Sequence, residues 1–136
     1  EAFDSEMKDR IALHQARRGP DWQTIHAPLN LPQALREADC KGPCLVDCLT
    51  IWLNNLMFAK QETATAADQL VVAIAARSDP VVLVTNEVGS GIVPENALAR
   101  RFRDEAGRMN QIIAAAVDEV YFSVSGIPVR IKPQPD

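Results

Sequence analysis

The chain has 136 residues, of which 47% are hydrophobic and 24% are charged. This size suits one compact domain with its own core and is too small for two domains of ordinary size. The formal net charge of −4 provides no basic face for a nucleic-acid backbone, and no apolar run approaches the length of a membrane span. We therefore expect no nucleic-acid partner and no stable membrane insertion.

The first half of the chain is predicted to alternate between helical and extended segments. Asp4 suits the N-cap of a helix that ends before Gly19 and Pro20, which both disfavour helix. The segment DWQTIHAP at 21–28 is expected to be extended. The next elements are a short helix, a strand, a helix and a polar, mobile loop, expected at 31–39, 44–49, 50–58 and 59–67.

The second half is predicted to contain the interior of a sheet. Residues 66–77 are expected to form an apolar helix, and the uniformly apolar strand in 79–86 is expected to be central and parallel. Pro94 is expected to begin a long helix, and 119–132 should form two strands around a Ser-Gly turn. The buried stripe of the long helix is predicted to be Leu98, Phe102, Ala106, Met109, Ile113 and Val117.

Strands that alternate with helices predict the α/β class, with a mostly parallel sheet, helices on both of its faces and a C-terminal hairpin. Ligands of such sheets bind where loops converge at the carboxyl ends of the strands. Thr85, Asn86 and Glu87 follow the apolar run VVLV, so we expect them at this edge, facing a ligand. Capping of the turn and of the next helix explains these residue types equally well.

Asp47 ends a second apolar run, CLVD. A carboxylate is costly to bury unpaired, so we expect it to face a cation or a donor at the end of the strand. In nucleotide-binding sheets this position belongs to an acid associated with Mg²⁺. The phosphate loop GxxxxGK[ST] that usually accompanies such an acid does not occur in these residues.

His14 lies in the first predicted helix, close to Arg10, Arg17 and Arg18. Guanidinium groups suit a phosphate, and cationic neighbours would keep the imidazole neutral, which is its nucleophilic form. A surface or packing role is the alternative for this histidine. On pattern alone we expect His26 to be structural.

Cys40, Cys44 and Cys48 are spaced by four residues, and a strand would place the second and third of them on the same side. Zinc is not expected, because the CxxC pairs or nearby histidines of zinc sites are missing from this region. We expect buried free thiols in a reducing cytoplasm.

Three segments together resemble one family: DSEMKDRIALHQARRGPDW, LVDCLTIWLNNLMF and VVLVTNEVGSGIVPENALARRFRDEAGRMNQIIAAAVDEVYFSVSGIPVRIK. The family is that of bifunctional adenosylcobinamide kinase and adenosylcobinamide-phosphate guanylyltransferase of cobalamin biosynthesis. The resemblance implies a RecA-like P-loop fold, a homotrimer and a cytoplasmic location. It also implies phosphorylation of adenosylcobinamide with ATP or GTP, then transfer of GMP from GTP onto that phosphate through a guanylylated histidine, with Mg²⁺ as cofactor.

The resemblance also assigns roles to individual residues. The RIxxH pattern of the family falls on Arg10–His14, which makes His14 the expected nucleophile. Asp47 matches an acid that acts toward the nucleotide or Mg²⁺, and the TNEVG stretch places Thr85, Asn86 and Glu87 on the side of the substrate or its phosphate. The other residues expected to contact the nucleotide are Gln15, Ala16, Arg17, Arg18 and His26.

The sequence departs from the family pattern in two places. The phosphate loop of the family would precede residue 1, so we expect 1–136 to be one incomplete P-loop domain that lacks a strand–P-loop–helix–strand unit. Without that unit, kinase activity should be lost. His26 replaces a glutamate whose carboxylate would accept from guanine. Either the preference for guanine is weaker in this chain, or a nearby acid such as Glu37 or Asp39 substitutes.

Two other functions fit the same residues. The chain could be a non-catalytic remnant of such an enzyme that only oligomerises or binds nucleotide, which the missing phosphate loop favours. It could also be a simple P-loop kinase that leaves His14 unmodified. The sequence leaves open which nucleotide is preferred and how the corrinoid is held.

Overall fold

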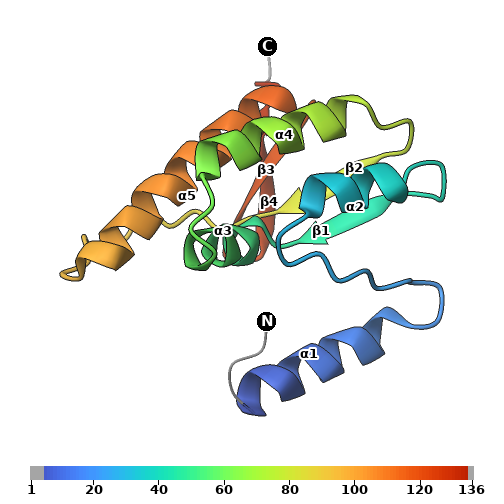
Figure 1. Ribbon diagram of the computed structural model, residues 1–136, viewed down its shortest axis with the longest axis horizontal. Coiled ribbons are helices and arrows are strands. Elements are labelled where there is room, and N and C mark those ends of the chain that lie inside the picture. Colours follow the sequence, from blue (N-terminus) through green and yellow to red (C-terminus); the bar gives the residue numbers. More distant parts are fainter. Residues whose placement is uncertain (1–4, 135–136) are drawn as a thin grey trace.

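The computed structural model describes residues 5–134, and in them five helices and four strands follow one another (Figure 1). The elements are α1 (Ser5–Arg18), α2 (Leu31–Glu37), β1 (Cys44–Asp47), α3 (Leu49–Phe58), α4 (Thr63–Ala75), β2 (Val81–Val84), α5 (Ala97–Ala116), β3 (Val120–Val124) and β4 (Ile127–Lys132). The predicted α/β class is confirmed as a mixed α/β protein. The N-cap predicted at Asp4 lies outside the described residues.

Strands β1 and β2 pair in parallel, and α3 and α4 form the connection between them. The register runs from Cys44 opposite Val81 to Asp47 opposite Val84, so both strands end at the same edge. Within residues 5–134, β2 pairs with β1 alone. The parallel pairing predicted for the strand in 79–86 is present, but its predicted central position is wrong for the described part of the chain. In agreement with a strand at the edge of the sheet, the Val82 side chain is 59% exposed.

The hydrophobic core lies mainly among α3, α4 and α5, and Figure 1 shows α4 and α5 side by side. Its most deeply buried large side chains are Leu49, Leu53, Leu56 and Leu70. Of the stripe predicted for α5, Ala106, Met109 and Ile113 are buried. Leu98 is 62% exposed, contrary to prediction, because it lies in the first turn of α5, which extends beyond the other elements in Figure 1.

Several boundaries differ from those expected from the sequence. The loop expected at 59–67 is shorter, because α4 already begins at Thr63, whose hydroxyl donates to Glu105 Oε2 at 2.5 Å. Helix α5 begins at Ala97 rather than Pro94, and the Asn96 side chain caps it by accepting from two backbone N–H groups. Strand β1 ends at Asp47, so Cys48 is the N-cap of α3 and not a strand residue.

The C-terminal hairpin is confirmed, with β3 and β4 antiparallel around Ser125 and Gly126. Both turn residues have positive φ, 54° and 76°, as in the two-residue turns whose twist matches that of the flanking strands. Many large apolar side chains of the hairpin are about half exposed. They are Tyr121, Phe122, Val124, Ile127, Val129 and Ile131.

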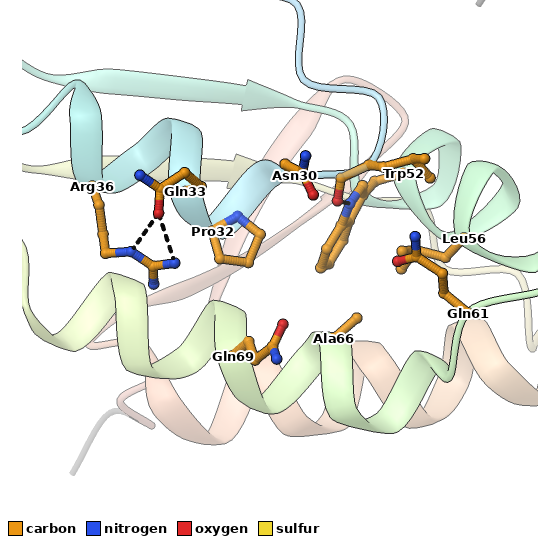
Figure 2. A pocket seen from close by; sticks show the side chains of 10 residues that line it. Asn30, Pro32, Gln33, Arg36, Trp52, Leu56, Gln61, Ala66 and Gln69 are labelled. Carbon is orange, nitrogen blue, oxygen red and sulfur yellow. Dashed lines mark hydrogen bonds between the residues drawn. The ribbon is translucent and has the colours of Figure 1, made fainter. Parts of the chain in front are cut away.

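A hollow of about 100 Å³ lies between α2, α3 and α4 (Figure 2). Trp52 is part of its wall, and the indole Nε1 donates to the carbonyl of Leu29 at 2.9 Å. On its rim, the Arg36 guanidinium donates to Gln33 Oε1 at 3.2 Å. None of the residues predicted for the functional site lines this hollow.

Polar contacts hold the edge of the β1–β2 sheet at which both strands begin, opposite the edge at which they end. Arg77 Nη1 donates to the carbonyl of Leu35 at 2.7 Å, and Gly42 N donates to Asp79 Oδ2 at 2.9 Å. The backbone N–H groups of Ser78 and Asp79 donate to Asp39 and hold the pKa of its carboxyl below the usual value. These contacts tie the connection before β1 to the connection before β2.

We expect the Asp39 carboxylate to make stability depend on pH in acid. Since its folded-state pKa lies below the unfolded-state value, its contribution is complete above the unfolded-state pKa and is lost as the pH falls through the folded-state pKa. Asp39→Asn should therefore lower the melting temperature at neutral pH and flatten the decline in acid. Thermal melts from about pH 7 to pH 2 test this, with exposed Asp68→Asn as the control. Matching acid profiles for Asp39→Asn and the parent would contradict it.

Candidate functional site

The parallel register brings the predicted edge residues together. Asp47 is the last residue of β1, and Thr85, Asn86 and Glu87 directly follow β2. In a parallel sheet this is the edge at which ligands bind. The structure therefore places both candidate groups, although they are almost 40 residues apart in the sequence, at one edge.

His14 reaches this edge from α1. Its Nε2 lies 3.2 Å from Asp47 Oδ2, which is hydrogen-bonding distance. The two side chains are 54% and 42% exposed, so the pair is open to solvent and to a substrate. Helix α1 has no buried residue, and an extended segment joins it to the remaining elements (Figure 1). The sequence predicts both residues for the site but not their contact.

Two of the arginines near His14 in α1 have other partners. Arg10 pairs with Glu6, with 2.5 Å between Nη2 and Oε1. Arg18 donates to Thr24 Oγ1 at 3.5 Å. Within residues 5–134 the charged group at hydrogen-bonding distance from the imidazole is the carboxylate of Asp47, so the site contains a histidine–carboxylate pair as well as the arginines of α1.

A chain of hydrogen bonds joins the residues after β2 to two other helices. Thr85 Oγ1 donates to Asn110 Oδ1 at 2.7 Å, and Asn110 Nδ2 donates to the carbonyl of Asn86 at 3.0 Å. Asn86 Nδ2 donates to Thr50 Oγ1 at 3.0 Å, and this hydroxyl lies 3.0 Å from Cys48 Sγ. The network thus ends one residue from Asp47.

Glu87 has a capping contact rather than a contact within this network. Its Oε1 accepts from the backbone N–H of Gly89 at 2.9 Å, while Arg103 donates to the carbonyl of Gly89. For this residue the observed bond is the turn-capping alternative that the sequence left open. It leaves Glu87 Oε2 without a hydrogen-bond partner in the described part of the chain.

The other predicted nucleotide-side residues are not brought into this network. The side chains of Gln15, Arg17 and His26 make no hydrogen bond or ion pair within residues 5–134, Ala16 has no polar side-chain atom, and His26 is exposed. The hydrogen-bond network at the edge instead includes two residues that the sequence analysis did not predict, Thr50 and Asn110. Asn110 did carry a signal, because asparagine is unfavourable inside a helix and this one is next to a buried methionine.

Among the described residues no group of three or more histidine, cysteine or acidic side chains could hold a metal ion. All three cysteines are free, as expected, but Cys40 is exposed and the other two are only half-buried, so the expectation of buried thiols is wrong. No described helix is long and apolar enough to cross a membrane.

The fold and the edge together define a mixed α/β protein with a histidine–carboxylate pair at the carboxyl ends of parallel strands. Residues 1–131 match the family described as "Cobinamide kinase / cobinamide phosphate guanyltransferase". The chain therefore belongs to this family of kinase and nucleotidyltransferase enzymes of cobalamin biosynthesis.

Three relatives show the same similarity. "Bifunctional adenosylcobalamin biosynthesis protein CobP" of Pseudomonas aeruginosa is 41% identical over 138 residues, covering 99% of this chain and 80% of the relative. The proteins named "Bifunctional adenosylcobalamin biosynthesis protein CobU" of Escherichia coli and Salmonella typhimurium are 40% and 44% identical. In both cases the match covers 96% of this chain and 81% of the relative.

Thr50 should contribute to stability through its hydroxyl, because the side chain is only 8% exposed and accepts from Asn86. Thr50→Val keeps the shape but leaves the Asn86 amide without its acceptor. We expect a loss of about 1–2 kcal/mol in the free energy of unfolding, measured by urea denaturation. Thr65→Val, on the exposed face of α4, is the matched control. Equal stability of the two variants would argue against this role.

Proposed function

We propose that this chain carries out guanylyl transfer through His14. GMP passes from GTP to His14 and then to adenosylcobinamide phosphate, which gives adenosylcobinamide-GDP and pyrophosphate. The observation that supports this most is the contact between His14 Nε2 and Asp47 Oδ2, 3.2 Å apart at the carboxyl edge of the parallel strands. Membership of the family supplies the reaction class.

The carboxylate determines which ring nitrogen is nucleophilic. An ionised aspartate can only accept hydrogen bonds, so Nε2 of His14 carries the hydrogen that faces Asp47. In the neutral ring the lone pair then lies on Nδ1. We therefore assign the attack on phosphorus to Nδ1.

The chemical step follows from this assignment. The Nδ1 lone pair forms a bond to the α-phosphorus of GTP, and the bond from phosphorus to the pyrophosphate oxygen breaks. The ring becomes a cation that keeps its hydrogen on Nε2, and the negative charge of Asp47 stabilises it. A phosphate oxygen of the corrinoid then attacks phosphorus, the N–P bond breaks, and the ring returns to its neutral form.

We propose that two arginines hold the phosphates. Arg17 and Arg18 follow His14 by three and four residues in α1, which is the spacing of neighbours on one helix face. Arg17 is exposed, and Arg18 Nε is buried without a partner in the described residues. Guanidinium groups at these positions would neutralise charge on the transferred phosphoryl group.

Asp47 also fits a role toward Mg²⁺. Its Oδ2 faces His14, whereas Oδ1 makes no hydrogen bond within the described residues. Magnesium sites that act on nucleotides often use one or two carboxylates together with substrate phosphates. When bound, the ion would neutralise phosphate charge, and Asp47 would be its ligand on this chain.

The kinase reaction, with ATP or GTP and adenosylcobinamide, needs a phosphate-binding loop that residues 1–136 do not contain. We propose it only for the protein that includes such a loop, with the RecA-like P-loop fold and helices on both faces of the sheet. Thr85 and Asn86 are proposed to lie on the substrate side. The exposed apolar side chains of the β3–β4 hairpin support assembly with further copies, for which we propose a homotrimer.

Incubation of the full-length protein with Mg²⁺ and GTP labelled at the α-phosphate tests guanylyl transfer. We expect a covalent label that is lost in acid and stable in alkali, as for a phosphoramidate, and no label in His14→Ala. Leu13→Ala, an exposed neighbour in α1 (57%), should label like the parent.

Equal labelling of His14→Ala would contradict the assignment of the nucleophile. No labelling of the parent would instead favour the non-catalytic remnant. Nucleotide binding and kinase activity without covalent label would favour a simple kinase.

A further inference from the structure

We propose that Asn110 is a positioning residue for the substrate side of the site, a role that rests on the proposed function of the carboxyl edge. Asn110 lies in α5 and is distant in sequence from every residue that the sequence predicts for the site. It holds the segment that leaves β2, and through this segment it sets the place of Thr85 and Asn86.

Both polar atoms of the Asn110 side chain are used. Its Oδ1 accepts from the hydroxyl of Thr85 at 2.7 Å, and its Nδ2 donates to the main-chain carbonyl of Asn86 at 3.0 Å. A carbonyl can only accept, so the amide nitrogen must face Asn86. This requirement fixes the orientation of the amide, and a carboxylate cannot meet it.

Asn110 lies on a buried part of α5, whereas the segment that follows β2 has no backbone pairing. Met109 and Ile113, on either side in α5, are 2% and 5% exposed. By contrast, 85–94 makes no backbone–backbone hydrogen bond in the described part of the chain. Side-chain contacts therefore hold this segment: Val88 packs against the core, and Asn110 bonds to the first two residues, Thr85 and Asn86.

The effect of Asn110 extends to the end of β1. Because the Asn86 main chain is fixed, the Asn86 side chain can donate to Thr50 Oγ1 at 3.0 Å. The Thr50 hydroxyl lies 3.0 Å from Cys48 Sγ, and Cys48 directly follows Asp47. Asn110 thus acts on the reacting groups only through Thr85 and Asn86.

A double-mutant cycle with a matched control tests this role. Asn110→Asp removes the donor to Asn86 and adds one negative charge. Gln111→Glu makes the same chemical change at the next position of α5, where the residue is exposed and its side chain makes no hydrogen bond in the described residues. Thr85→Val removes the hydroxyl that donates to Asn110. The values of kcat/KM for GMP transfer and the melting temperature are measured for each, at a temperature where all are folded.

We expect Asn110→Asp to lose roughly tenfold in kcat/KM. The bond to the Asn86 carbonyl is lost, and the new carboxylate oxygen then faces that carbonyl oxygen, so the two acceptors repel and the segment with Thr85 is displaced. We expect Gln111→Glu to stay within about twofold. The double variant Thr85→Val/Asn110→Asp should be no worse than Asn110→Asp alone, since both changes act on one network. The proposal would be overturned if the loss of kcat/KM in the double variant equalled the product of the losses in the two single variants. It would also be overturned if Asn110→Asp kept a kcat/KM close to that of the parent.

Backbone ¹⁵N relaxation by NMR provides a readout that does not need activity. In Asn110→Asp the order parameters of the amides of 85–89 should be lower than in the parent, and in Gln111→Glu they should not. Unchanged order parameters in Asn110→Asp overturn the positioning role whether or not the parent transfers GMP. A parent without transfer activity but with the expected loss of order would count against the proposed function alone.

Discussion

Parallel pairing of β1 with β2 is the constraint on which the site depends. Asp47 lies opposite Val84, so both strands end at the same edge of the sheet. Asp47 and the polar residues that directly follow β2 are therefore brought to that edge by the strand pairing alone. The contacts of Asp39 and Arg77 at the opposite edge hold the starts of the same strands. The sheet is small, but both of its ends are fixed.

Helix α1 adds what the sheet does not provide, the histidine that we propose as the nucleophile. It has no buried residue, so the hydrophobic effect does little to hold it against the described residues, and the contact between His14 and Asp47 joins it to the end of β1. In the proposed mechanism the same carboxylate that contacts the ring also determines its tautomer, so one residue of β1 would control both the place and the reactivity of His14.

The sequence predicted the elements with strong local signals and missed those set by tertiary contacts. Hydrophobic periodicity and the Ser-Gly turn were enough for α5 and the hairpin. The first turn of α4 was missed because Glu62 provides no capping side chain. Apolar runs followed by Asp47 and by Thr85 placed both at an edge, since parallel strands require it. The contact of His14 with Asp47 spans 33 residues and a long extended linker, and no local pattern fixes such a path.

The tautomer of His14 is the most direct test of the account, because the choice of nucleophilic atom depends on it. NMR of the protein with ¹⁵N-labelled histidine, at a pH of about 8 where imidazole is uncharged, distinguishes the two ring nitrogens. The account predicts that His14 carries its hydrogen on Nε2 in the parent and loses this preference in Asp47→Ala. Hydrogen on Nδ1 in the parent, or the same ring signals in both proteins, would contradict it.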